Sequence, residues 1–297
     1  MILVTGAGGK TGKTIIKALA GRGEVVGAFI HREEHISAVR ALGAQEAIVG
    51  DLRDEAALCA AMMEVRAVYH ICPNVNPDEV TIGKAAISAA RSARVERFVY
   101  HSVLHPQAEG MPHHWNKLKV EEALLESGLS STILQPTAYM QNILAYWAEI
   151  IEQGVLRIPY PVETRISLID LDDVAEAAAT VLTEPGHVGA TYELVGTPAL
   201  SQAEVAEVVS QKLGRSVRVE AQSIEEWEAR ARASDMGEYQ RETLIKMFRY
   251  YARCGLAGNP NVLGWLLGRP PTTLDEFVLW TARGQAPRSR RPRYCER

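Results

Sequence analysis

The sequence lacks the features that mark membrane, secreted or nucleic-acid-binding proteins. It has only four cysteines, and their spacing matches no paired zinc-ligand pattern. No apolar run reaches the roughly 18 residues that a membrane-spanning helix needs. The net charge of −4 offers no basic surface to nucleic acid or to an anionic membrane. These absences favour a reduced, cytoplasmic protein that binds a small molecule and has neither a nucleic-acid nor a membrane partner.

Length and composition are those of a folded protein with a sizeable core. The chain has 297 residues, of which 47% are hydrophobic and 23% charged, enough for one large or two small domains. An apolar run begins at Met1, so we expect no signal or transit peptide. No coiled-coil heptad is visible, and we expect a monomer or a homodimer.

The first fourteen residues carry the strongest local signal. An apolar run of strand type, Ile2–Val4, ends in a glycine cluster, and a helix-forming run follows at 15–20. A strand, a tight glycine turn and a helix N-terminus together present free backbone N–H groups and a positive helix end to an anion. We therefore predict a phosphate-binding site in this stretch.

Two phosphate-binding motifs overlap there. Gly6, Gly9 and Gly12 suit a dinucleotide-binding turn, although they depart from the strict G-x-G-x-x-G spacing. Gly12-Lys13-Thr14 suits the end of a nucleotide-triphosphate loop, but the first glycine of that motif would fall on Ala7. The local sequence leaves both interpretations open.

Up to about residue 135, apolar runs alternate with helical segments. This alternation is typical of a parallel sheet covered by helices on both faces. Ligands of such sheets bind at the carboxyl ends of the strands, so the residues after each run are the candidates for function. The predicted strands are 2–4, 25–30, 47–49, 67–72, 98–100 and 132–134, and the predicted helices are 14–20, 35–42, 56–63, 82–93 and 117–125.

Arg32 follows the second predicted strand, where an NAD-binding fold usually carries an acidic residue for the ribose 2′-hydroxyl. A guanidinium instead suits the 2′-phosphate of NADP(H), which it binds through fork-like, charge-assisted hydrogen bonds. Arg32 therefore favours NADP(H) over NAD(H). The alternative is a solvated residue that opens the next helix.

The third and fourth predicted strands are followed by two further candidate loops. Asp51 and Leu52 are candidates for contacts with adenine. Alternatively, Asp51 caps the next helix or, in a nucleotide triphosphatase, binds a metal ion. The turn-rich loop Cys72-Pro73-Asn74 is a candidate for contacts with the ribose or nicotinamide of a cofactor.

Ser102 follows the fifth predicted strand, and the next helix contains Lys117 and Glu121. These two residues are four apart and share one helix face, as they would in a surface ion pair. In the functional interpretation, Lys117 projects to cofactor hydroxyl groups. Four histidines of this region match no common zinc pattern, so no metal site is expected: His101, His105, His113 and His114.

By their order and spacing, several motifs resemble the NmrA-like branch of the atypical short-chain dehydrogenases/reductases. The similarity extends from residue 1 to about residue 215. It favours the dinucleotide-binding turn over the nucleotide-triphosphate loop at residues 6–14. The motifs that carry it are Thr5-Gly-x-x-Gly-x-x-Gly12, Arg32, Asp51-Leu52, Arg97-Phe-Val-Tyr-x-Ser102, His113-x-x-x-Lys117-x-x-x-Glu121, Ser127-Gly-Leu129, Pro136, Tyr139-Met-Gln-Asn142, Asp170-Leu-Asp-Asp173 and Tyr192-x-Leu-x-Gly196.

This resemblance implies an α/β fold, a Rossmann-type doubly wound parallel sheet with a smaller C-terminal α+β substrate domain, and NADP(H) in the cleft between the domains. We expect an NADP-binding domain over residues 1–150. A mostly helical substrate domain is expected over 151–282, with some strands that pack back on the first domain. The arginine-rich stretch 283–297 is predicted to be a mobile basic tail.

The resemblance also assigns roles to single residues. It places Lys117 at the nicotinamide ribose and Arg32 at the 2′-phosphate. Ser102 comes at the strand end beside the nicotinamide, and Pro136 and Tyr139 are on the nicotinamide side. The residues assigned to the pyrophosphate are Gly6, Gly9, Lys10, Thr11 and Gly12.

One position departs from the wider superfamily, whose catalytic members use Tyr-x-x-x-Lys with the tyrosine as proton donor. His113 stands four residues before Lys117, and no tyrosine is in register. His113 or His114 could donate a proton, because imidazole titrates near neutrality, or the proton could come from water. Lys117, His113 and Ser102 are therefore the candidate catalytic residues.

The predicted function is hydride transfer from NADP(H) to a small aromatic, quinone-like or conjugated-carbonyl acceptor in the interdomain cleft. The aromatic residues of the C-terminal half favour this prediction, since a few of them could line an acceptor pocket. The alternative is a non-catalytic NADP(H)-binding redox sensor that acts through a protein partner. The missing tyrosine favours that alternative.

Overall fold

The computed structural model describes residues 1–234 and 236–284. The chain divides into two compact units. The first comprises Met1–Gln135 and Val174–Tyr192, and the second comprises Pro136–Asp173 and the described residues from Glu193 onward. The first segment of the first unit ends at Gln135, and the chain returns to this unit at Val174. From residue 285 on, the predicted tail lies outside the described residues.

A seven-stranded sheet forms the centre of the first unit, with the strand order β10-β6-β5-β4-β1-β2-β3. Neighbouring strands from β3 to β6 pair in parallel. The strand order reverses at β1, as it does in doubly wound folds. The strands are β1 (Ile2–Val4), β2 (Val26–Ile30), β3 (Ala44–Val49), β4 (Ala67–His70), β5 (Arg97–His101), β6 (Ser131–Pro136) and β10 (Thr191–Leu194).

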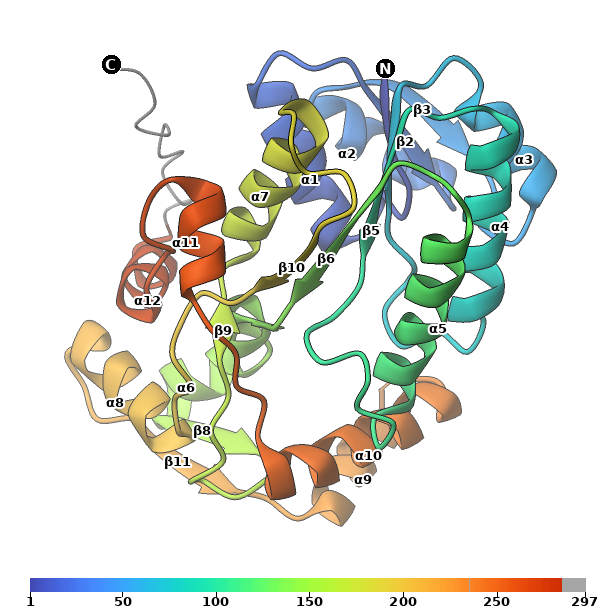
Figure 1. The fold of residues 1–297 in the computed structure, drawn as a ribbon. Coiled ribbons are helices and arrows are strands. Elements are labelled where there is room, and N and C mark those ends of the chain that lie inside the picture. The colour runs from blue at the N-terminus through green and yellow to red at the C-terminus, as the bar shows by residue number, and fades with distance from the viewer. Residues whose placement is uncertain (235, 285–297) are drawn as a thin grey trace. The chain divides into compact units, whose positions relative to one another are not determined.

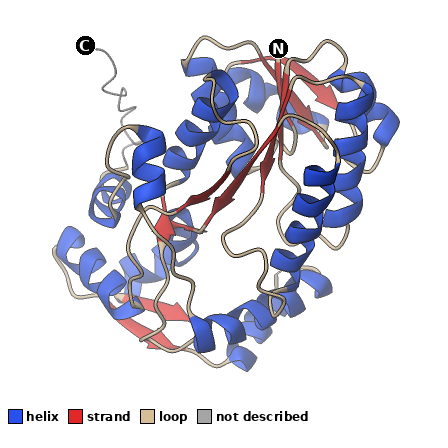
Figure 2. Cartoon of the chain, viewed as in Figure 1, coloured by secondary structure: helices blue, strands red, loops and turns tan. Residues whose placement is uncertain are grey.

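Helices cover both faces of this sheet (Figures 1 and 2). Figure 1 shows α3, α4 and α5 on one face and α1, α2 and α7 on the other. The doubly wound α/β fold expected from the sequence is thereby confirmed. The bounds are α1 (Lys10–Gly21), the 3-10 helix η1 (Glu33–His35), α2 (Ile36–Ala41), α3 (Glu55–Met62), α4 (Glu79–Ser92), α5 (Pro112–Glu126) and α7 (Leu171–Thr183).

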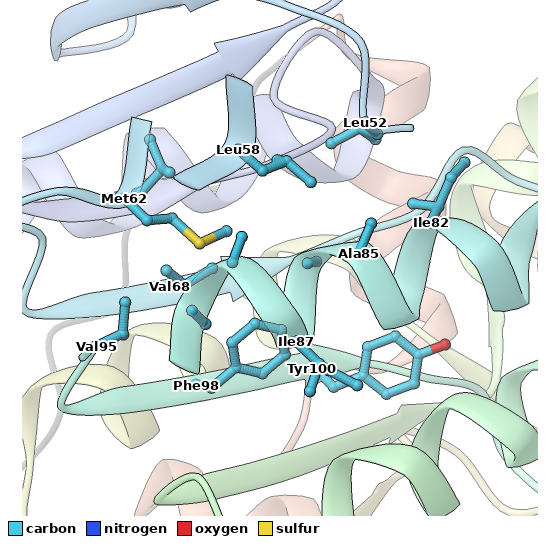
Figure 3. Packing of buried hydrophobic residues seen from close by; sticks show 14 of the residues in the cluster. Leu52, Leu58, Met62, Val68, Ile82, Ala85, Ile87, Val95, Phe98 and Tyr100 are labelled. Atoms are coloured by element: carbon cyan, nitrogen blue, oxygen red, sulfur yellow. The ribbon is translucent and has the colours of Figure 1, made fainter. Parts of the chain in front are cut away.

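One hydrophobic core lies between the sheet and helices α3, α4 and α5. In Figure 3, Leu58 and Met62 of α3 and Ile82 of α4 point into the same buried cluster as Phe98 of β5. Strands that are covered on both faces read as continuous apolar runs, which is why the sequence revealed them. Within this layer α4 and α5 pack closely: a Cβ on Gly83 of α4 would lie 2.5 Å from a methyl carbon of the α5 valine opposite it.

The second unit is mainly helical, with two pairs of short parallel strands, β8 with β11 and β7 with β9. Three of the described helices of this unit begin with a capping box. None of the described helices is both long and apolar enough to cross a membrane. The bounds are β7 (Ala138–Tyr139), η2 (Met140–Tyr146), α6 (Trp147–Gln153), β8 (Val155–Ile158), β9 (Leu168–Ile169), α8 (Gln202–Leu213), β11 (Arg218–Ala221), α9 (Ile224–Arg232), α10 (Glu238–Cys254), α11 (Asn261–Leu267) and α12 (Leu274–Ala282).

Candidate functional site

The glycine-rich loop joins β1 to α1 and needs glycine for two separate reasons. Gly6 has a φ of +59°, and a Cβ there would lie 2.6 Å from the backbone oxygen of Ile71. A Cβ on Gly12 would lie 2.7 Å from both the Cα of Ala7 and the backbone oxygen of Gly6. The first glycine permits the sharp turn and the second permits the close approach of the helix, as a dinucleotide-binding turn requires.

Helix α1 begins without a side-chain cap. Gly9 is its N-cap residue, and the first turn, which starts with Lys10 and Thr11, contains no acidic residue. The first N–H groups of a helix have no partner within it, and together with the helix dipole they favour an anion. The backbone donors of the loop thus fit the pyrophosphate of a dinucleotide, with no carboxylate of the first turn to repel it.

The segment that carries Arg32 lies against this loop. The His35 ring packs on Gly8, where a Cβ would lie 2.3 Å from His35 Nδ1. Arg32 itself is exposed, and its guanidinium pairs with the Glu34 carboxylate at 2.9 Å. Because an exposed ion pair contributes little, a phosphate could replace Glu34 as the partner of this guanidinium.

The loop after β3 places Asp51 and Leu52 in different environments. Asp54, and not Asp51, caps α3, because its carboxylate accepts the Ala57 N–H at 3.0 Å. Asp51 pairs with Arg53 at 3.1 Å, and the hydrogen bonds from Arg53 lower the pKa of the Asp51 carboxyl. Leu52 is buried in the hydrophobic core shown in Figure 3.

The end of β4 combines buried polar groups with an exposed turn. The Thr5 hydroxyl lies 2.9 Å from His70 Nδ1, and burial lowers the pKa of His70 to about 4. Cys72 is buried, and burial raises the pKa of its thiol. Pro73 and Asn74 are exposed. Of the three predicted loop residues, these last two are the ones accessible to a ligand.

Helix α5 brings Lys117 into a buried cluster at the carboxyl end of β5. Its Nζ donates to the Glu79 carboxylate at 2.9 Å and to the backbone oxygen of His101 at 3.2 Å. The Tyr100 hydroxyl donates to the same carboxylate oxygen at 2.8 Å. The partner of Lys117 is therefore Glu79 at the start of α4, and the surface ion pair with Glu121 that the sequence left open is wrong.

Glu121 belongs to a second buried group one turn along the same helix. The Ser102 hydroxyl donates to the Glu121 carboxylate. Gln135 Nε2 donates to both carboxylate oxygens, at 2.9 and 3.0 Å. Burial raises the pKa of Glu121. The hydroxyl proton of Ser102 is thus directed at Glu121.

His113 and His114 lie in the first turn of α5, with their rings edge to face and their centroids 4.5 Å apart. Burial lowers the pKa of His113 to about 3 and that of His114 to about 4, so both rings are neutral near pH 7. His113 was considered as a proton donor because imidazole ordinarily titrates near neutrality, and this reason does not hold for the buried ring. Its role in catalysis stays a prediction.

The remaining predicted residues, Pro136 and Tyr139, fall in the second unit, which begins at the last residue of β6. Tyr139 is the last residue of β7. The aromatic residues of this unit pack on one another: ring centroids are 4.8 Å apart for Trp227 and Phe248, and 6.0 Å apart for Tyr160 and Tyr251. Within residues 1–234 and 236–284, no group of three or more His, Cys, Asp or Glu side chains is arranged to hold a metal ion.

Comparison with known proteins identifies the family. A match to the NmrA-like family covers residues 1–278. The chain belongs to the NmrA-like family. It is 33% identical over 283 residues to an NAD(P)H azoreductase of Xenophilus azovorans, which covers 94% of this chain and 96% of that protein.

Solved structures extend the comparison. The NADPH-dependent quinone oxidoreductase QOR2 of Escherichia coli, crystallised with NADPH, is 28% identical, with a TM-score of 0.83 over 94% of this chain and 98% of that chain. A structure of NmrA, described as a negative transcriptional regulator, is 18% identical, with a TM-score of 0.78 over 94% of each chain. This last likeness shows the fold alone.

Two polar residues of this NmrA-like site were missed by the sequence analysis, Glu79 and Gln135. Glu79 follows Pro77 and Asp78, and an acidic residue in such a place is usually a solvated first-turn residue. The signal that could have revealed it is position: Glu79 opens the helix that follows β4, beside the carboxyl ends of the central strands. Gln135 directly follows the predicted strand 132–134, a position at which the sequence analysis looks for functional residues, and it is buried.

Proposed function

We propose that this member of the NmrA-like family is an NADP(H)-dependent oxidoreductase that passes hydride to a small aromatic, quinone-like or conjugated-carbonyl acceptor. One observation carries the proposal: a single unit contains both an uncapped, glycine-rich helix start and a buried lysine at the carboxyl end of β5. The relatives named as an NAD(P)H azoreductase and an NADPH-dependent quinone oxidoreductase support this choice of cofactor and acceptor.

Each part of the site has a binding role in this proposal. The glycine loop and the first turn of α1 bind the pyrophosphate, and Arg32 binds the 2′-phosphate. Lys117 donates to a ribose hydroxyl. Ser102 and His113 are the candidates for hydrogen bonding to the acceptor, His113 as a donor and Ser102 as an acceptor, because the Ser102 proton is directed at Glu121. NADPH supplies the hydride. The contribution of the protein is to hold the reacting groups in line.

In this proposal the proton that follows the hydride comes from water. Tyr100 is unsuited to the role of the missing tyrosine, because its hydroxyl donates to Glu79, and burial together with that carboxylate holds its pKa well above the ordinary value. His113 and His114 are neutral near pH 7. A reduced quinone or azo product is readily protonated from solvent, so the reaction needs no proton donor of its own on the protein.

The test is NADPH oxidation by the purified protein across a panel of quinones, azo dyes and conjugated carbonyls, with NADH in parallel. Turnover with a preference for NADPH is the expected result. Turnover with NADH alone would retain the enzyme and remove the role of Arg32. If the protein bound neither cofactor, the assignment of the glycine loop to the pyrophosphate would be wrong, and with it the proposed function.

A second candidate function is a non-catalytic NADP(H)-binding redox sensor. The lack of a proton donor favours this function: of the groups near Lys117, His113, His114 and Tyr100 all have pKa values far from neutrality. A sensor should distinguish NADP⁺ from NADPH clearly and turn over no acceptor. Dissociation constants for the two forms, measured beside the acceptor panel, separate the two functions.

A further inference from the structure

Glu79 is a buried carboxylate with one cationic partner. It is 2% exposed and opens α4, where the helix dipole favours a negative charge. Its Oε1 accepts from both Lys117 Nζ and the Tyr100 hydroxyl. Figure 3 shows the Tyr100 hydroxyl at the end of the ring that points away from Phe98 and the apolar cluster. A buried charge of this kind persists only where it is paired and hydrogen-bonded, and both conditions are met here.

Lys117 is held from two sides. Of its three N–H donors, one is directed at Glu79 and one at the backbone oxygen of His101, the last residue of β5. The Tyr100 ring lies 5.3 Å from Nζ and encloses the ammonium further. Two fixed acceptors leave one N–H of the ammonium for a ligand, and they determine where that donor points.

We infer that Glu79 is a positioning residue that fixes both the location and the charge of the Lys117 ammonium, and that NADP(H) affinity depends on it. This inference rests on the proposed function, because it assumes that the remaining N–H of Lys117 serves the cofactor. Glu79 itself acts only through Lys117.

Among the described residues, no other charged group forms an ion pair with Lys117. Burial lowers the pKa of His70 and His114 to about 4 and that of His101 and His113 to about 3, so these rings are neutral near pH 7. Glu121 is hydrogen-bonded to Ser102 and Gln135. The described titratable groups around the ammonium are His70 and Cys72 at the end of β4, Tyr100 and His101 on β5, Glu79 at the start of α4, and His113, His114 and Glu121 on α5.

Glu79→Gln tests the inference, because glutamine keeps an acceptor oxygen and removes the charge. The Lys117 side chain is only 11% exposed, so without its counter-ion the ammonium is desolvated and the neutral amine is favoured. We expect the Kd for NADPH, relative to that of the parent protein, to change by less than about threefold near pH 6 and to rise by more than about tenfold near pH 9. Glu79→Asp keeps the charge and should show no such rise.

The readout is NADPH binding by fluorescence titration across this pH range, with thermal unfolding of each variant as a check of folding. Glu55→Gln is the control. Glu55 is the first residue of α3, and its carboxylate accepts at 2.5 Å from Ser88, which is on α4, the helix that Glu79 opens. Its Kd ratio should stay near one at every pH. A purely structural role for Glu79 would weaken binding equally at all pH values and would overturn the inference.

A double-mutant cycle with Lys117→Met keeps the inference testable if Glu79→Gln alone does not fold. Removing both partners leaves no buried charge unpaired, so Glu79→Gln/Lys117→Met should fold. If Glu79 acts through Lys117, the double variant binds NADPH as Lys117→Met does. A further loss of affinity in the double variant would overturn the inference. Failure of the parent protein to bind NADPH would instead overturn the proposed function, and with it this inference.

Discussion

Two buried carboxylates of this chain illustrate how a residue's partners decide its charge. Glu79 faces the ammonium of Lys117 and is matched by an opposite charge. Asp170, which is fully buried in the second unit, accepts from two neutral donors among the described residues, the Gln141 amide at 2.7 Å and the Asp172 N–H at 3.0 Å. These hydrogen bonds oppose the desolvation only in part, and burial raises the pKa of Asp170 from its ordinary 3.8 to about 6.

Asp170 should therefore make stability depend on pH in a defined window. The folded state holds this proton more tightly than the unfolded chain does, so the contribution to stability is fully present below about pH 4 and is lost as the pH rises through about 6. The pKa difference corresponds to about 3 kcal/mol at most. In Asp170→Asn, the free energy of unfolding should exceed that of the parent protein above pH 6 and match it near pH 4.

Urea denaturation between about pH 4 and pH 8 measures this effect. Glu225→Gln, which changes an exposed carboxylate of α9 in the same unit, serves as the control and should leave the pH dependence unchanged. If Asp170→Asn destabilised the protein most strongly above pH 6, the Asp170 carboxylate would be contributing stability in its charged form, and the argument from burial would be wrong.

At the scale of elements, helix α1 contains two glycines, one with no room for a Cβ atom and one with ample room. A Cβ on Gly12 would lie 2.7 Å from backbone atoms of the glycine loop, whereas a Cβ on Gly21, at the end of the same helix, meets nothing within 4 Å. Gly12→Ala should cost about 1 to 3 kcal/mol of stability and weaken NADPH binding, because the loop must move. Gly21→Ala should stabilise the protein by about 0.5 to 1 kcal/mol through the unfolded state and leave NADPH binding unchanged.

Thermal unfolding and NADPH titration of the two variants test this prediction together. Equal effects of the two substitutions would mean that position 12 has no steric requirement for glycine. The close approach of α1 to the loop would then be irrelevant to the cofactor.

Helix starts mark the limit of what the sequence could predict at this scale. The central strands and helices were found because buried strands are continuously apolar and the helices carry apolar stripes. Three helices nevertheless begin several residues before the predicted point: α1 at Lys10 and not 14, α4 at Glu79 and not 82, and α5 at Pro112 and not 117. Apolar periodicity is absent from these first turns, because they carry polar groups of the site. Glu79 was missed for this reason.

At the scale of the whole molecule, the contacts that build the site join residues far apart in the sequence. Glu79 and Lys117 are 38 positions apart, and Thr5 and His70 are 65 apart. Periodicity and spacing predict the elements and their order, but they do not show which side chain of one element faces which of another. The family resemblance supplied the position of Lys117 and could not supply its partner, since that depends on the packing of α4 against α5.

The division into units also depends on contacts between segments that are far apart in the sequence. After residue 173 the chain returns to the first unit, where α7 covers the sheet and β10 pairs beside β6. Arg97 at the start of β5 donates to the backbone oxygen of Val181 in α7 at 2.9 Å. The sequence analysis expected some later strands to pack back on the first domain, but the order of elements does not show which segment returns, because residues 136–173 in between belong to the other unit. The first unit therefore consists of two segments that are separate in the sequence, residues 1–135 and 174–192.

Cofactor binding should be visible in the stability of the whole chain. A ligand that binds only the folded state stabilises it by about 2.7 kcal/mol when its concentration is one hundred times Kd. NADPH should raise the midpoint of thermal unfolding more than NADH does at the same concentration. Only NADPH carries a 2′-phosphate, the group assigned to the exposed Arg32 guanidinium in the proposed function.

Arg32→Ala should abolish this difference by weakening NADPH about tenfold while leaving NADH unchanged. Arg40→Ala removes an exposed arginine from the neighbouring helix α2 and should preserve the difference, which excludes a general effect of net charge. Equal stabilisation of the parent protein by NADH and NADPH would show that Arg32 is a solvated residue. The glycine loop would then still account for binding of a dinucleotide, but selectivity for the phosphorylated form would have no basis in this segment.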